Sequence, residues 1–160
     1  MDIWTERLEY RHLPILENWT GRTAGRMTSC DFPGKKEAVP EWYEACIAEP
    51  GREDYLVSVY ETPVGLGGFR QCRRAPEAAE VYLMLGEANY NLLRTATYAT
   101  LQLLHRAFRN YSRINTAVYR CHSKYLDALM RMGFSPVDAF GEMADLTVNK
   151  ESFLSRIYLF

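Results

Sequence analysis

Apolar residues recur at steps of three and four along four segments of the chain, and this spacing predicts four helices with one buried face each. The longest segment begins at Leu92 and continues to about Arg109. Two shorter ones have Pro14 and Pro40 near their start, which fits a first helical turn, where the missing N–H breaks no hydrogen bond. The predicted helices span residues 13–19, 37–49, 92–109 and 123–132. In the second, the apolar stripe consists of Val39, Trp42, Tyr43, Cys46 and Ile47.

Segments rich in β-branched and aromatic residues predict strands between these helices. Residues 54–60 and 64–71 flank the turn signal Glu61-Thr62-Pro63 and predict a hairpin. The run from Ala79 to Leu85 is strongly apolar and predicts a fourth strand. The predicted strands are residues 2–11, 54–60, 64–71, 79–85 and 114–119, with a last hairpin over 138–148 and a short helix or strand within 150–160.

The order of the predicted elements indicates the fold class. A hairpin-built antiparallel sheet leads into a strand–helix–strand crossover, followed by a helix and two closing strands, which is typical of an α+β fold with a mixed sheet. The 160 residues predict one domain, residues 1–160, long enough to bury a core without a disulfide or metal.

Composition excludes several classes of protein. The chain is 48% apolar with a net charge of −1, which excludes disorder, and no apolar run approaches the length of a membrane span. No signal peptide is expected, because residues 1–7 are neither basic nor followed by an apolar segment. The cysteines are widely spaced, which argues against zinc and favours reduced thiols in a cytoplasmic protein. They are Cys30, Cys46, Cys72 and Cys121.

The charges are unevenly distributed. Residues 94–131 carry seven basic residues and one acidic residue, a local charge of +6 within a nearly neutral protein. Such a zone suits a phosphate-bearing small ligand better than a long nucleic acid, and it contains no helix-turn-helix or RNP-like pattern. A solvated basic surface is the alternative explanation.

Residues 6–149 resemble the GNAT superfamily of acyl-CoA-dependent N-acyltransferases. In that family a fourth strand leads into a phosphate-binding turn, a long helix, a fifth strand and a short helix that ends in Gly-Phe, here Gly133-Phe134. The front half, with Glu17-Asn18-Trp19 and the strand end Val64-Gly65-Leu66-Gly67-Gly68-Phe69, resembles the subgroup that acetylates ribosomal-protein N-termini and amino nucleotide-sugars.

The resemblance implies a mostly antiparallel sheet of about six to seven strands, with helices on both faces and a splay between the fourth and fifth strands. It implies acetyl-CoA or another acyl-CoA as co-substrate, and no metal. The acyl-pantetheine would lie along Leu83, Met84 and Leu85, and the phosphates at the start of the long helix. The aligned phosphate turn is Asn91, Leu92, Leu93, Arg94, Thr95 and Ala96.

This turn departs from the family pattern Q/R-x-x-G-x-G/A. Only Ala96 matches, and Arg94 replaces the central glycine. The arginine side chain either obstructs the close approach of a phosphate or contacts it directly. The remaining alternative is that residues 91–96 form an ordinary first turn of a helix.

The resemblance also implies a general base and a general acid. The family often places the base where Glu80 opens the fourth strand, and Glu87 is the reserve candidate. Many members carry a tyrosine that acts as the general acid at the position of Leu129. Because that tyrosine is missing here, the candidates for the general acid are Tyr125, one helical turn earlier, and His122. The structural alternatives are a surface carboxylate for Glu80, core packing for Tyr125 and a helix-start contact for His122.

The acceptor would be a primary amine on a small molecule or a protein N-terminus. The loop residues expected to bind it are Trp19, Arg22 and Arg26, of which the arginines suit an acidic or phosphate-bearing acceptor. Ordinary solvated loop arginines are the alternative. No nucleic-acid or membrane partner is expected, and the oligomeric state is left open, a homodimer included.

Two functions from different classes follow. The first is N-acyl transfer from acyl-CoA to a primary amine. The second is a catalytically inactive GNAT-like module with a CoA-sensing or protein-binding role, suggested by the altered turn and the missing tyrosine. An open gap with unpaired backbone between the fourth and fifth strands would favour the enzyme. A gap filled by Tyr or Arg side chains would favour the module.

Overall fold

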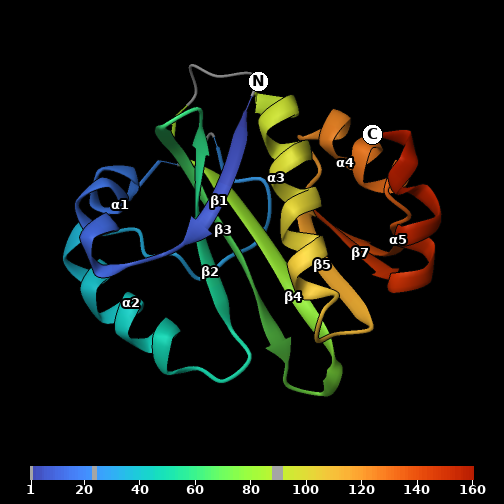
Figure 1. Ribbon diagram of the computed structural model, residues 1–160, viewed down its shortest axis with the longest axis horizontal. Helices are drawn as coiled ribbons and strands as arrows, with labels where there is room; N and C mark the ends of the chain where they lie inside the picture. The colour runs from blue at the N-terminus through green and yellow to red at the C-terminus, as the bar shows by residue number, and fades with distance from the viewer. Residues whose placement is uncertain (1, 23–24, 88–91) are drawn as a thin grey trace.

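The computed structural model describes residues 2–22, 25–87 and 92–160, and the strands within them form one sheet (Figure 1). The seven strands of these residues lie in the order β1-β2-β3-β4-β5-β7-β6, antiparallel throughout except for the parallel pair β4 and β5. The strands are β1 Ile3–Arg7, β2 Glu53–Val59, β3 Thr62–Cys72, β4 Ala75–Leu85, β5 Arg113–Tyr119, β6 Ser135–Phe140 and β7 Met143–Asn149. The predicted α+β fold with a mixed, mostly antiparallel sheet is thereby confirmed.

Helices cover both faces of the sheet (Figure 1). They are α1 Leu13–Trp19, α2 Val39–Ala48, α3 Leu92–Ala107, α4 Ser123–Arg131 and α5 Lys150–Arg156, with short 3₁₀ turns η1 Tyr10–His12, η2 Lys36–Ala38 and η3 Ile157–Leu159. β4 contributes to the apolar core on each face. Val81, Leu83 and Leu85 pack in the core that contains α3 and α4. Tyr82 and Met84 pack in the core that contains α1 and α2. The alternation of a strand thus explains why this run is apolar almost throughout.

The predicted order of elements is confirmed, and the differences lie at their ends. β4 begins at Ala75, ahead of the predicted start at 79, because Ala75 already pairs with Cys72 of β3. The C-terminal segment forms α5, and the side chain of Asn149 caps it by accepting a hydrogen bond from Ser152 N at 2.8 Å.

The apolar stripe of α2 is narrower than predicted. Val39, Trp42, Tyr43 and Cys46 are buried, but Ile47 is 59% exposed. One residue advances about 100° around a helix, so Ile47 lies beyond the side of the helix that touches the sheet.

The parallel pair β4 and β5 diverges after a short contact. The strands pair only at Ala78–Arg113, Ala79–Ile114 and Glu80–Asn115. One residue further, Thr116 Oγ1 donates a hydrogen bond to the carbonyl of Val81 at 3.0 Å. The predicted splay between the fourth and fifth strands is therefore present, and it opens a gap in the middle of the sheet.

Candidate active site

The gap between β4 and β5 is occupied by residues 25–29 of the same chain, which we call the strap. Along β4, Leu85 N donates to the carbonyl of Gly25 at 2.7 Å. Met27 N donates to the carbonyl of Leu83 at 3.2 Å, and Leu83 N donates to Thr28 Oγ1 at 3.0 Å. The main-chain groups that β4 turns toward the gap at Leu83, and the N–H of Leu85, are therefore satisfied by the strap.

The strap also pairs with β5 on its other side. Ser29 N donates to the carbonyl of Ala117 at 2.8 Å, and Tyr119 N donates to the carbonyl of Met27 at 3.1 Å. Antiparallel bridges to Met84 and Val118 complete the arrangement. The gap is therefore filled, although by main chain and not by the Tyr or Arg side chains that would have marked an inactive module.

Two residues explain why this segment lies so deep. A Cβ atom at Gly25 would stand 1.6 Å from the carbonyl oxygen of Leu85, so only glycine fits there. The side chain of Met27 is 1% exposed and belongs to the core that contains α3 and α4. Full burial of such a side chain contributes about 1.5–3 kcal/mol to the stability of the folded state. The strap is thus held by both packing and hydrogen bonds.

Trp19 and Arg22, which were predicted to bind the amine acceptor, contact the residues that directly follow β4. Trp19 is fully buried, and its Nε1 donates to Glu87 Oε1 at 2.9 Å. Arg22 Nη1 donates to the carbonyl of Gly86 at 2.7 Å and lies 3.5 Å from Glu87 Oε2. The indole ring leaves no room for a Cβ atom at Gly86, which would lie 2.2 Å from it.

Arg26, the third predicted acceptor residue, lies within the strap. Its Nη2 donates to the carbonyl of Phe32 at 3.4 Å. Its Nε is buried and has no hydrogen-bond partner among the described residues. A guanidinium nitrogen that is buried without a hydrogen-bond partner loses its hydration without compensation, so it destabilises the strap in its position between β4 and β5.

A cavity of about 350 Å³ opens from the gap on the side of α3 and α4. Its lining residues are Met27, Leu92, Leu93, Cys121, His122, Ser123, Lys124 and Tyr125. His122 Nε2 lies 2.9 Å from the carbonyl of Arg26, which requires the tautomer that donates from Nε2. Both predicted acids therefore line one cavity, beside the first turn of α3.

The two predicted acids differ in how they are held. The hydroxyl group of Tyr125 is buried and hydrogen-bonded to Thr100 Oγ1 at 2.7 Å, and burial raises the pKa of Tyr125 well above its ordinary value. The ring of His122 is half-buried, and its N–H contacts the strap. Of the two candidate acids, His122 is therefore the one with a hydrogen bond to the strap.

The aligned phosphate turn lies partly outside the described residues, because Asn91 is not among them. Leu92 and Leu93 are half-buried in the first turn of α3 and line the cavity. Thr95 and Ala96 are buried. Arg94 is exposed, and its guanidinium carbon lies 5.7 Å from the ring centroid of Tyr98.

A second cavity, of about 220 Å³, lies on the side of α1 and α2. Its lining residues are Ser29, Cys30, Asp31, Arg52, Arg70, Glu80 and Tyr82. Glu80, the predicted base, is exposed there, and it forms no hydrogen bond or ion pair with another described side chain. The strap separates this cavity from the one that contains His122 and Tyr125.

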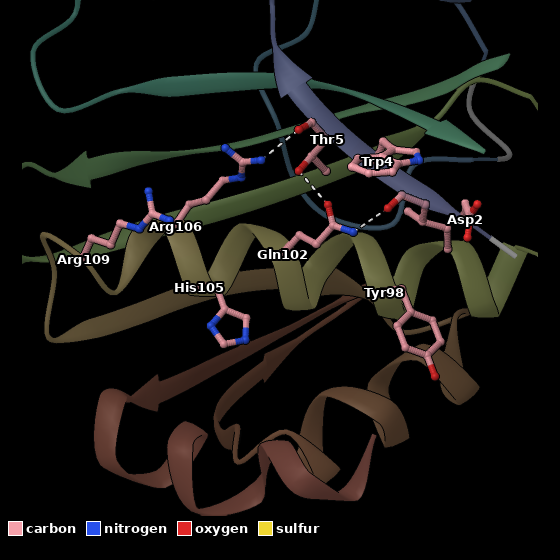
Figure 2. Close-up of a pocket in the computed structure, with 9 residues that line it drawn as sticks. Asp2, Trp4, Thr5, Tyr98, Gln102, His105, Arg106 and Arg109 are labelled. Atoms are coloured by element: carbon pink, nitrogen blue, oxygen red, sulfur yellow. Dashed lines mark hydrogen bonds between the residues drawn. The ribbon is translucent and has the colours of Figure 1, made fainter. Parts of the chain in front are cut away.

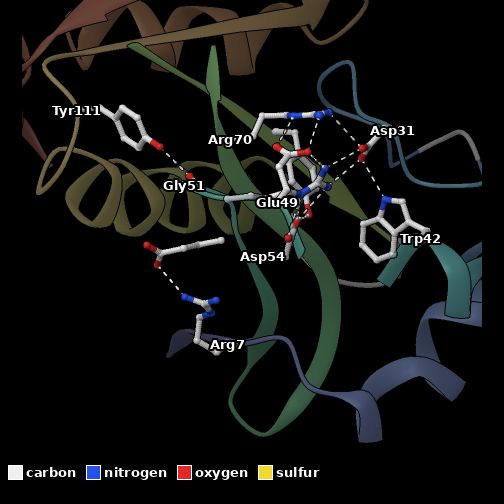
Figure 3. Close-up of polar contacts among 11 residues, drawn as sticks. Arg7, Asp31, Trp42, Glu49, Gly51, Asp54, Arg70 and Tyr111 are labelled. Atoms are coloured by element: carbon white, nitrogen blue, oxygen red, sulfur yellow. Dashed lines mark hydrogen bonds and ion pairs between the residues drawn. The ribbon is translucent and has the colours of Figure 1, made fainter. Parts of the chain in front are cut away.

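A network of ion pairs forms the floor of the second cavity (Figure 3). The guanidinium group of Arg52, 3% exposed, donates to Asp31 at 2.8 Å and to Asp54 at 3.0 Å. Arg70 donates to Glu49 at 2.7 Å and to Asp31 at 3.2 Å. With Glu80, the region contains more carboxylates than guanidinium groups, and this excess attracts cations.

Asp31 gives the network a dependence on pH. Burial alone would raise the pKa of Asp31, but hydrogen bonds from Arg52 and Trp42 outweigh it and lower the pKa to about 2. Because the folded-state pKa is depressed, the stabilisation is present above about pH 4 and is lost as the pH falls toward 2.

Replacing Asp31 with asparagine is therefore expected to lower the free energy of unfolding by about 1 kcal/mol at pH 7, a value discounted for the partial exposure of the carboxylate. The difference from the unmodified protein should shrink between pH 4 and pH 2 in urea titrations. Asp127→Asn, an exposed carboxylate on α4, is the matched control and should change little. A deficit for Asp31→Asn that persisted unchanged at pH 2 would contradict this account.

Sequence reasoning missed both the strap and the ion-pair network. Gly25 is the one local signal for the strap, but in the sequence alone a glycine at this point is typical of any loop. The network joins a loop, a helix end and two strands, so no spacing in the sequence reveals it.

A larger cavity, of about 570 Å³, lies elsewhere, between β1 and α3 (Figure 2). Gln102 Nε2 donates to the carbonyl of Ile3 at 2.6 Å, and Arg106 Nη2 donates to the carbonyl of Thr5 at 2.8 Å. Side chains of α3 thereby cap the outer edge of β1. None of the residues predicted to bind substrate or CoA lines this cavity.

Two further properties concern the described ranges as a whole. Within them, no set of three His, Cys, Asp or Glu side chains is grouped to hold a metal ion. No helix in them has both the length and the apolar character of a membrane span.

The fold is that of the GNAT N-acetyltransferases. Aminoglycoside acetyltransferase AAC(6')-Ib in complex with coenzyme A matches with a TM-score of 0.75 and 14% identity, over 96% of this chain and 98% of that one. A variant of spermidine N-acetyltransferase SpeG from Vibrio cholerae matches with a TM-score of 0.77 and 15% identity, over 97% and 98%. No family model and no curated protein sequence matches the chain.

Proposed function

We propose that the protein is an acyl-CoA-dependent N-acyltransferase, which moves an acetyl or other short acyl group to a primary amine. The observation that carries this proposal is the divergence of β4 and β5 beyond Glu80, within a fold whose neighbours include complexes with coenzyme A. At Leu83 and Leu85, β4 turns main-chain groups into the gap, where an extended pantetheine arm would pair with them as a neighbouring strand does.

The cavity beside α3 and α4 supports a site for the CoA phosphates. Leu92 and Ser123, the first residues of these two helices, both line it. The N-terminus of a helix favours anions, and Lys124 adds a positive charge to the lining. The exposed guanidinium group of Arg94, in the first turn of α3, suits a phosphate contact at the rim.

The cavity on the opposite face supports a cationic acceptor. Two carboxylates, Asp31 and Glu80, and two guanidinium groups, Arg52 and Arg70, line it. Both guanidinium groups are paired with carboxylates, so Glu80 is the lining charge that has no partner among the described side chains. One structural neighbour is a spermidine N-acetyltransferase, and another was solved in complex with ribostamycin and coenzyme A. We infer a small-molecule amine or a protein N-terminus as acceptor, with Trp19, Arg22 and Arg26 ordering the loop that leads to the cavity.

In the proposed chemistry the general base and the general acid lie on opposite faces of the sheet. Glu80 accepts a proton from the ammonium group of the acceptor, and the neutral amine attacks the thioester carbonyl. The C–S bond breaks, and the new amide nitrogen releases its second proton to water. His122 supplies a proton to the departing thiolate and regains one from water. Tyr125 is the weaker candidate for this last step, because burial raises its pKa and its hydroxyl group is hydrogen-bonded to Thr100.

Binding and turnover test the proposal directly. Acetyl-CoA at a hundredfold excess over its Kd is expected to raise the Tm by about 5–10 °C. Free thiol should then appear when a suitable primary amine is added from a panel of polyamines, aminoglycosides and short peptides. Absence of both effects at millimolar acetyl-CoA would exclude the function.

Because residues 25–29 occupy the gap, we also consider a second function, a GNAT-fold module that senses CoA or binds a protein without acyl transfer. This alternative predicts that CoA raises the Tm while no amine in the panel releases thiol. Release of thiol with any amine, at a rate above the hydrolysis blank, would eliminate it.

A further inference from the structure

The strap uses the same groups of β4 that an extended ligand would need. It takes the N–H and C=O of Leu83 and the N–H of Leu85, in hydrogen bonds of 2.7 to 3.3 Å. One edge of a strand pairs with a single extended partner at a time. A pantetheine arm along β4 and the strap in its present place therefore exclude each other.

Further groups of the strap lie at the cavity beside α3 and α4 and at His122. Met27 lines the cavity beside α3 and α4, and its side chain is almost fully buried in the core of that face. The carbonyl of Arg26 accepts the Nε2 proton of His122 at 2.9 Å. The closed strap thus blocks both the backbone groups and the proton donor assigned to the thiolate.

Two hydrogen-bonding deficits weaken the strap in its position between β4 and β5. The Nε atom of Arg26 is buried without a hydrogen-bond partner among the described residues. The carbonyl of Leu83 receives the N–H groups of both Met27 and Thr28, at 3.2 and 3.3 Å, and neither contact is short. A segment held with these deficits can exchange with a competing ligand that pairs more completely.

We propose that residues 25–29 are an internal occupant of the acyl-CoA slot, which must leave before CoA binds, and that its departure frees the edge of β4 and the N–H of His122 together. This inference rests on the proposed acyltransferase function. It makes the apparent affinity for CoA depend on the fraction of molecules with an open strap.

The glycines of this loop offer a matched pair of variants. Gly25→Ala puts a Cβ atom where the carbonyl oxygen of Leu85 lies, which forces the strap out of the gap. Gly34→Ala is the same substitution in the same connection between α1 and α2, with no atom within 4 Å of the added methyl group. Both variants and the unmodified protein are titrated with CoA and acetyl-CoA by calorimetry, and amide exchange of β4 is followed by NMR.

We expect Gly25→Ala to bind CoA about tenfold more tightly than Gly34→Ala and the unmodified protein, with faster amide exchange at Leu85. Equal or weaker binding by Gly25→Ala, despite fast exchange at Leu85, would overturn the inference and leave the acyltransferase proposal intact. Absence of binding by all three proteins, with Leu85 exchanging fast in Gly25→Ala, would overturn both.

A measurement on the unmodified protein covers the case in which Gly25→Ala does not fold. Saturating CoA should accelerate amide exchange at Met27 and Ser29, because their hydrogen bonds to β4 and β5 are broken when the strap leaves. Protection of both amides that is unchanged with CoA bound would overturn the inference.

Discussion

Replacing Arg52 with methionine is expected to lower the free energy of unfolding by about 3–5 kcal/mol. The guanidinium group of Arg52 is 3% exposed and supplies hydrogen bonds to both Asp31 and Asp54. Asp54 is itself buried, so its carboxylate would lose its partner cation without gaining water. Urea denaturation at pH 7 measures the loss.

Arg70→Met is the matched control for this prediction. Arg70 joins the same network but is partly exposed, so water replaces its contacts and the expected loss is below about 1 kcal/mol. Combining Arg52→Met with Asp54→Asn should restore part of the stability, because the uncompensated buried charge is then removed. A loss for Arg52→Met as small as that for Arg70→Met would show that Asp54 is hydrated in the folded protein.

Replacing Glu80 with glutamine is expected to lower kcat/KM for the best amine acceptor by about 10²- to 10⁴-fold. The proposed base would lose its ability to take a proton, while its size is retained. The affinity for CoA should not change, because Glu80 lines the cavity on the side of α1 and α2 and does not line the cavity beside α3. Steady-state thiol release and calorimetry separate the two effects.

Glu77→Gln provides the comparison on the same strand. Glu77 is exposed on β4 but lines neither cavity, so activity should remain close to that of the unmodified protein. Full activity in Glu80→Gln would remove this residue as the base. Glu87 would then be the remaining candidate for the base, and its carboxylate accepts the indole N–H of Trp19 and lies beside Arg22.

The fold was predictable because its signals are local. The apolar spacing from Leu92 onward needs only the period of a helix, and the alternating contributions of β4 to two cores make Ala79–Leu85 apolar except at Glu80. The ends of elements were less predictable. Whether Ala75 belongs to β4 depends on its pairing with Cys72, and the exposure of Ile47 depends on how far α2 covers the sheet.

The candidate site was only partly predictable, because its residues meet through tertiary contacts. Glu80, His122 and Tyr125 were proposed from their positions relative to neighbouring elements, and their roles stay predictions. The deep placement of Gly25 and Met27 required knowledge of a gap that exists only after β4 and β5 diverge. The arginine partners of Asp31 lie 21 and 39 residues further along the chain, so only the folded structure reveals the network.

The strap also affects how the protein behaves without any ligand. Two strands that diverge within a sheet present two rows of unpaired N–H and C=O groups, which serve as templates for pairing with other chains. Residues 25–29 cover part of both rows, at Leu83 and Leu85 on one side and at Ala117 and Tyr119 on the other. The segment proposed to exclude CoA thus also protects these strand edges from pairing with other chains. Variants that displace it are expected to aggregate more readily as the protein concentration rises.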